Sequence, residues 1–146
     1  MRFNRSTILW ILFAFYILLV LELTLLCGQG QSELRLVPFE VISQQFRYLF
    51  RGYAIPFLLN VVGNILMFVP MGFFLPLLKK LSFPKTVLCG FLFSLFIEIA
   101  QLPLDRVSDV DDLILNTVGT VVGFGFFLFA KHLYKILQEY KKHRQS

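Results

Sequence analysis

Cysteine and histidine are scarce in this chain of 146 residues, which has two of each. Cys27 and Cys89 fall at opposite ends of two different hydrophobic stretches, so a disulfide between them is not expected. Neither forms a CxxC motif, which excludes zinc-ribbon and thioredoxin-like sites. His132 and His143 lie in a basic C-terminal segment, where we expect them to be solvated. The sequence shows no Ser-His-Asp arrangement, no Cys-His pair and no P-loop. We expect no cofactor and no metal.

Hydrophobic residues, by contrast, make up 57% of the chain, and 18 residues are phenylalanine. Soluble domains are roughly half apolar. The apolar residues form four runs, at Ile8–Leu26, Ile55–Leu78, Thr86–Leu102 and Leu113–Ala130. Each run is near the roughly 20 residues that a helix needs to cross a bilayer. The sequence therefore predicts an all-α integral membrane protein with four transmembrane helices.

A cleaved signal peptide is the alternative for the first run, because Arg2 and Arg5 precede it. The run is longer than the roughly 7 to 15 apolar residues of a signal peptide, and Glu22 interrupts it. We therefore expect a retained helix.

Lysine and arginine are distributed unevenly between the segments that flank the four runs, and such residues favour the cytoplasmic side. One side carries Arg2, Arg5, Lys79, Lys80, Lys85, Lys131, Lys135, Lys141, Lys142 and Arg144. The other side carries Arg35, Arg47, Arg51 and Arg106. This distribution predicts cytoplasmic termini in a multi-pass plasma membrane protein. It also accounts for the net charge of +5, so we expect contact with anionic membrane lipids and no nucleic acid.

The chain is expected to form one membrane domain over residues 8–130, followed by a basic cytoplasmic tail over 131–146. Its one long loop, between the first two runs, is predicted to be external. Within it, Val41–Tyr53 has apolar residues at helical spacing, with Arg47 and Arg51 one turn apart. This pattern predicts an amphipathic helix in the outer membrane interface.

Polar residues interrupt the last three runs near their outer ends. Asn60 and Asn64 are four residues apart, and Glu98 and Gln101 three apart, so each pair shares one face of a helix. Glu22 of the first run lies at a similar depth. Because ionisable residues inside membranes are costly, their presence there indicates function.

The fourth run places its polar and small residues on one helical face: Asp109, Asp112, Asn116, Gly119 and Gly123. The last two form a GxxxG motif, which permits close helix packing and indicates a homo-oligomer through Gly119 and Gly123.

Ser108 and Asp111 have capping-box spacing, which assigns Asp111 and Asp109 in part to capping the fourth helix. Arg106 is expected to neutralise one of the neighbouring acids. Which of Asp109, Asp111 and Asp112 is functional stays open. All these features lie at one depth, which predicts a polar pocket open to the outside. We expect it to be lined by Asn60, Asn64, Glu98, Gln101, Arg106, Asp109, Asp112 and Asn116.

The strings NVVGNILMFVPMG, IEIAQ and RVSDVDDLILNTVG, together with the upstream VPF, resemble in order and spacing those of the VanZ-like proteins of Gram-positive bacteria. The resemblance covers roughly Ile8 to Ala130. It implies a link to resistance against teicoplanin and related lipoglycopeptide antibiotics. The motifs correspond best at Asn64, Glu98, Gln101 and Asn116.

Three functions remain open from the sequence. The first is a non-enzymatic protein that binds a cell-envelope lipid, a lipid-linked cell-wall precursor or a lipoglycopeptide at the outer pocket. The second is an enzyme that acts on a lipid-linked precursor, with Glu98 and Asp112 as acid and base or as ligands of a divalent cation such as magnesium or calcium. The third is a small transporter or flippase subunit in which Glu98 carries a proton.

Overall fold

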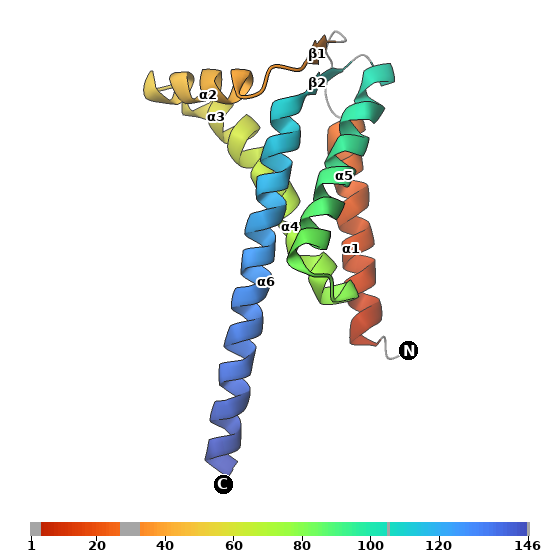
Figure 1. Cartoon of the computed structure of the whole chain (residues 1–146), viewed down its shortest axis with the longest axis vertical. Helices are drawn as coiled ribbons and strands as arrows, with labels where there is room; N and C mark the ends of the chain where they lie inside the picture. Colours follow the sequence, from red (N-terminus) through yellow and green to blue (C-terminus); the bar gives the residue numbers. More distant parts are fainter. Residues whose placement is uncertain (1–3, 27–32, 105, 146) are drawn as a thin grey trace.

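The structure, a computed structural model, describes residues 4–26, 33–104 and 106–145 (Figure 1). Within that part of the chain, four helical stretches are long and apolar enough to span a membrane. They are Ser6–Leu26, Ala54–Lys79, Phe83–Leu104 and Val110–Arg144. The prediction of four membrane-length helices is thus confirmed. The start of α1 and the end of α6 lie toward the same end of the bundle (Figure 1), while the side of the membrane that they occupy stays a prediction.

The four spans are assembled from the following helical elements. α1 (Arg5–Leu21) continues into the π-helical turn η1 (Glu22–Leu26); α3 (Ala54–Phe57) continues through the π-helical turn η2 (Leu58–Val62) into α4 (Gly63–Lys79); α5 (Phe83–Gln101) ends in the 3₁₀ turn η3 (Leu102–Leu104); and α6 (Val110–Gln145) is the fourth. Cys27 lies outside the described residues.

Helix α2 (Glu40–Phe50) corresponds to the amphipathic helix predicted over Val41–Tyr53, and it begins one residue earlier and ends three earlier. It runs across the end of the bundle, at an angle to the long helices (Figure 1). Phe46 and Phe50 are exposed along it. A helix is thus confirmed, and its position in the membrane interface stays a prediction.

Two short strands lie at the same end of the bundle as α2. β1 (Glu33–Arg35) pairs in parallel with β2 (Val107–Asp109), so that Leu34 lies opposite Ser108. The sequence analysis did not predict these strands. The pairing joins the loop after α1 to the loop before α6, and it thereby fixes both beside the end of α5.

Close packing of α4 against α6 holds the middle of the bundle together. A β-carbon at Gly119 would overlap the carbonyl oxygen of Ile65, and one at Gly123 would overlap that of Val69. Lipid tails are as apolar as the side chains, so membrane helices associate largely by such backbone approach. The GxxxG face therefore has its partner within the chain and not in a second copy. A homo-oligomer would have to use another surface.

Candidate functional site

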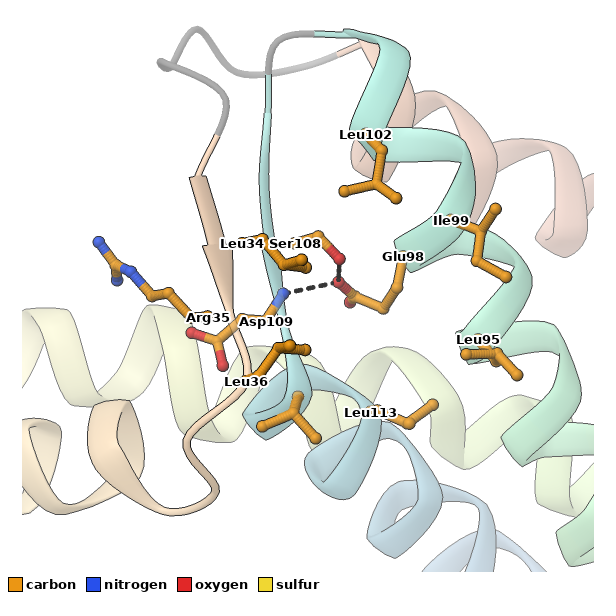
Figure 2. Close-up of a pocket in the computed structure, with 11 residues that line it drawn as sticks. Leu34, Arg35, Leu36, Leu95, Glu98, Ile99, Leu102, Ser108, Asp109 and Leu113 are labelled. Carbon is orange, nitrogen blue, oxygen red and sulfur yellow. Dashed lines mark hydrogen bonds between the residues drawn. The ribbon is translucent and has the colours of Figure 1, made fainter.

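The carboxylate of Glu98 connects α5 to the strand before α6. Glu98 is only 7% exposed. Its Oε2 accepts a hydrogen bond from Ser108 Oγ at 3.0 Å and one from the Asp109 backbone N–H at 2.8 Å (Figure 2). Ser108 therefore binds Glu98, and the expected capping box with Asp111 is not formed.

Asp109 carries this connection on to the start of α6. Its Oδ1 accepts a hydrogen bond from the Asp111 N–H at 2.9 Å, which is the capping role expected for Asp109. Burial raises the pKa of Asp109 above the ordinary value, and the hydrogen bond from Asp111 opposes that rise. The negative charge of Asp111 adds to the rise.

Asp111 caps a helix, but not the one that the sequence analysis assigned. Its fully buried carboxylate accepts hydrogen bonds from the backbone N–H groups of Phe39, at 2.5 Å, and Ile42, at 2.9 Å. These are donors at the start of α2, where no side chain of α2 itself acts as a cap. The prediction that Asp111 caps the fourth helix was wrong. The local spacing of Ser108 and Asp111 is what a cap of that helix would also show, so it could not reveal the contact with α2. A contact with a segment 69 to 72 residues earlier leaves no local trace.

Asn64 meets Asp112 between α4 and α6. Its Nδ2 donates to Asp112 Oδ1 at 2.5 Å. Asn60, predicted to lie on the same face as Asn64, is instead exposed. Asn60 lies in the π-helical turn η2, whereas Asn64 lies in α4 beside α6.

Gln101 and Arg106 converge on the end of the first span. Gln101 Nε2 and Arg106 Nη1 both donate to the carbonyl oxygen of Thr24, at 3.0 and 2.9 Å. Carbonyls near a helix C-terminus lack helical partners and favour positive charge, which explains this convergence. Glu22 is exposed, so the first span contributes a backbone carbonyl where we expected its carboxylate. The proposed pairing of Arg106 with an acid stays a prediction.

Asn116 lies deeper between α5 and α6. It is 2% exposed, and its Nδ2 donates to Ser94 Oγ at 2.8 Å. Its Oδ1 is buried without a hydrogen-bond partner, as is Oε1 of Gln101. Buried oxygens of this kind are rare and costly, so these two amides have spare capacity to accept a donor.

A pocket of ≈180 Å³ opens at the edge of this cluster, between β1, α5 and α6 (Figure 2). Most of its wall is aliphatic, and Arg35, Glu98, Ser108 and Asp109 supply the polar groups. The aliphatic wall consists of Leu34, Leu36, Leu95, Ile99, Leu102, Val110 and Leu113.

The single pocket expected from the sequence is therefore divided. Of the eight residues predicted to line it, Glu98 and Asp109 do so. Asn64 lines a separate groove of ≈610 Å³ between α1 and α4, which also includes Tyr16 and Met67. The other five residues line neither of the two.

Sequence reasoning missed Leu34 and Leu36, which form one wall of the pocket. The alternation of Leu34, Arg35 and Leu36 is typical of a short strand and was the available signal. The two carboxylates that the enzyme alternative requires have separate partners, Ser108 and Asp109 N–H for Glu98, and Asn64 for Asp112. Among the described residues, no group of three or more His, Cys, Asp or Glu side chains is arranged to hold a metal ion.

These features define a multi-pass membrane protein with a buried cluster of carboxylates and amides at one end of its helices. The chain belongs to the VanZ/LLP1 family, which matches residues 7–131, and the resemblance seen in the sequence is thereby confirmed. No curated protein and no solved structure gave a match. The matched region contains the whole cluster and ends where α6 extends beyond the bundle.

Proposed function

We propose that this VanZ-like protein binds a cell-envelope lipid, or the lipid part of a lipoglycopeptide, in the pocket between β1, α5 and α6. The observation that carries the proposal is the composition of that pocket. Aliphatic side chains from three elements surround two buried carboxylates, Glu98 and Asp109, at the end of the membrane helices. An amphiphile with an acyl chain and a donor-rich head group has the complementary chemistry.

The carboxylates are suited to orient the head group of such a ligand. Glu98 Oε2 already accepts two hydrogen bonds from the protein. This holds the side chain in one position, with the remaining oxygen as an acceptor for an amide, hydroxyl or ammonium group of the ligand. Leu34 and Leu36 close the pocket only because β1 pairs with β2, so binding also depends on that pairing.

Lower susceptibility to teicoplanin-type antibiotics would follow if the pocket faces outward, as the charge distribution predicts. These drugs act on lipid-linked cell-wall precursors at the outer surface. A protein that binds such a precursor, or the acyl chain of the drug, would reduce the binding of the drug to the precursor. The proposed ligands are thus confined to amphiphiles of the outer leaflet in Gram-positive bacteria.

The test is to extract the protein with its surrounding lipid and to identify bound lipids by mass spectrometry. Leu95→Trp fills the pocket, and we expect it to reduce the bound lipid by about tenfold, since each 1.4 kcal/mol of lost affinity is a factor of ten. Leu92→Trp is the matched control. It lies one turn earlier on α5, is 51% exposed and does not line the pocket.

A Glu98→Gln variant separates orientation of the head group from filling of the pocket. Its amide keeps one acceptor oxygen and loses the charge, so we expect a change in which head groups are retained, with normal expression. In a host that the wild type protects against teicoplanin, both Leu95→Trp and Glu98→Gln should restore susceptibility. Equal lipid retention in wild type, Leu95→Trp and Leu92→Trp would overturn the proposal.

A further inference from the structure

Helix α6 is longer than the bundle that it belongs to. It has 36 residues, or about 54 Å at 1.5 Å per residue, whereas the hydrocarbon core of a bilayer is about 30 Å thick. Near the end of α4, a groove is lined by Leu77 of α4 and by Ala130, Lys131 and Tyr134 of α6. Beyond this level α6 projects alone (Figure 1).

An apolar stripe runs along this projecting helix, and we name it the tail seam. The tail seam consists of Val122, Phe126, Phe129, Leu133, Ile136 and Tyr140, which are between 39% and 67% exposed. Their spacing alternates strictly between four and three residues. This is the heptad spacing of positions a and d, through which two helices pack in a coiled coil.

The upper part of the tail seam needs no protein partner, because lipid covers Val122, Phe126 and Phe129 within the span. The lower part differs. Leu133 lies at about the level of Lys79, where α4 ends and the polar surface of the bilayer is expected, and Ile136 and Tyr140 continue the same stripe past it. Apolar residues at regular spacing outside the bilayer indicate a protein surface that covers them.

Charges along α6 are arranged as a pair of parallel helices requires. Lys131, Lys135, Lys141 and Lys142 occupy positions b, c and f, away from the tail seam. The two charged residues that flank it are Glu139 at position g and Arg144 at position e of the next heptad. In a parallel coiled coil, g of one helix lies beside the following e of the other. Glu139, which is 3.9 Å from Lys135 of its own helix, would therefore also meet Arg144 of the second copy.

We propose that the tail seam is an interface with a second copy of this chain, which forms a parallel two-stranded coiled coil. Two copies inserted in one membrane already have parallel α6 helices, and their confinement raises the effective concentration, which compensates for the short seam. Gly119 and Gly123 are not part of this interface, because they pack against α4. No proline or glycine follows Gly125 in α6, so the tail has no residue that favours a bend onto the membrane surface.

The first experiment is disulfide trapping in native membranes, in a Cys27→Ser, Cys89→Ser background. Ile136→Cys lies at a d position, where the α-carbons of two parallel helices come within disulfide range. Gln138→Cys, two residues on and at position f, is the matched control. We expect at least about fivefold more cross-linked dimer at 136 than at 138. Equal cross-linking at both positions, or none at 136, would overturn the proposal.

The second experiment measures mass in lipid nanodiscs for the full chain. Leu133→Glu with Ile136→Glu should convert dimer to monomer, while the melting temperature of the bundle is unchanged because neither side chain contacts it. A dimer that survives the double change uses another surface and overturns the proposal. A monomeric wild type overturns it too, and quenching by lipid-attached probes would then show whether the tail lies on the membrane.

The third experiment tests the register of the pair. Glu139→Arg or Arg144→Glu alone should lower the dimer fraction by about twofold, and the two together should restore it. Two single variants that weaken the dimer without recovery in the double variant would overturn the parallel alignment.

Discussion

The first and second halves of α6 have the same helical structure and opposite surroundings. The first half has buried polar groups, Asp111, Asn116 and Thr120, and two glycines in backbone contact with α4. The second half is exposed from Lys131 to Arg144. Within the described part of that half, the one ion pair is Lys135 with Glu139 at 3.9 Å.

This contrast separates two ways in which a membrane helix is used. In the first half, polar groups are satisfied by other segments of the same chain, as the absence of water in lipid requires. The second half is predicted to lie outside the bilayer, where water would be available to its polar face and few tertiary contacts would be needed. Stability should therefore respond strongly to changes in the first half and weakly to changes in the second.

The largest effect should come from Gly123→Leu. The new side chain would overlap the α4 backbone at Val69, and we expect a loss of about 3 kcal/mol or more in the free energy of unfolding. Thermal unfolding in lipid or mild detergent measures it. Gly125→Leu is the matched control, because nothing lies within 4 Å of a β-carbon there. A similar melting temperature for both variants would contradict the packing of α4 against α6.

Asp111→Ala should have the next largest effect. It leaves the N–H groups of Phe39 and Ile42 without acceptors, at a cost of about 2 kcal/mol. Hydrogen exchange at the start of α2 should accelerate, with little change in the middle of α4. Ser43→Ala, which removes an exposed hydroxyl from the same helix, serves as the control. Unchanged exchange at residues 39 and 42 would show that α2 is not capped by Asp111.

A smaller effect is expected from pH through Asp109. Its pKa is raised in the folded protein, so the folded state binds the proton more tightly than the unfolded state does. Its contribution to stability is therefore present at low pH and is lost as the pH rises above 3.8, the ordinary value of the group. Asp109→Asn keeps the acceptor oxygen for the Asp111 N–H and should remove that part of the loss. Parallel pH profiles of melting temperature for the wild type and the variant would contradict the shift.

Lys135→Ala should have the smallest effect. The pair with Glu139 is exposed and has lysine before glutamate, the weaker orientation on a helix, so we expect less than about 0.5 kcal/mol. The melting temperature of the bundle should not move measurably. A shift as large as that of Asp111→Ala would mean that α6 contacts the rest of the chain beyond Tyr134.

The helices could be predicted from the sequence because hydrophobic length specifies spans directly. Helical phase placed Glu98, Gln101 and Asn116 on the polar faces of their helices, and all three are buried. It failed at Asn60, which lies in the π-helical turn η2 and is exposed. Helical phase also shows which residues share a face but not what that face contacts. Gly119 and Gly123 were therefore assigned to an interface with a second copy, whereas in the structure they contact α4.

The candidate site was harder to predict because its contacts join distant segments. The spacing around Asp111 correctly predicted that this residue caps a helix, but it indicated the fourth helix where the structure shows α2. The strand pair that shapes the pocket is three residues long on each side, too short to produce a clear alternation. The backbone carbonyl of Thr24, which accepts hydrogen bonds from Gln101 and Arg106, could not be predicted from residue types because every residue has one. Its role depends on where the first helix ends, which is a property of the backbone.

The position of the α2 cap has a consequence for the order of biogenesis. The donors of Phe39 and Ile42 leave the ribosome 69 to 72 residues before the carboxylate that receives them. At about 5 to 20 residues per second, several seconds pass in which the segment before the second span has neither its cap nor its partner strand. Translation must reach the fourth helix before this end of the molecule closes. A chain that ends before residue 107 would contain the first three spans. It would lack both β2, the partner of β1, and Asp111, the cap of α2.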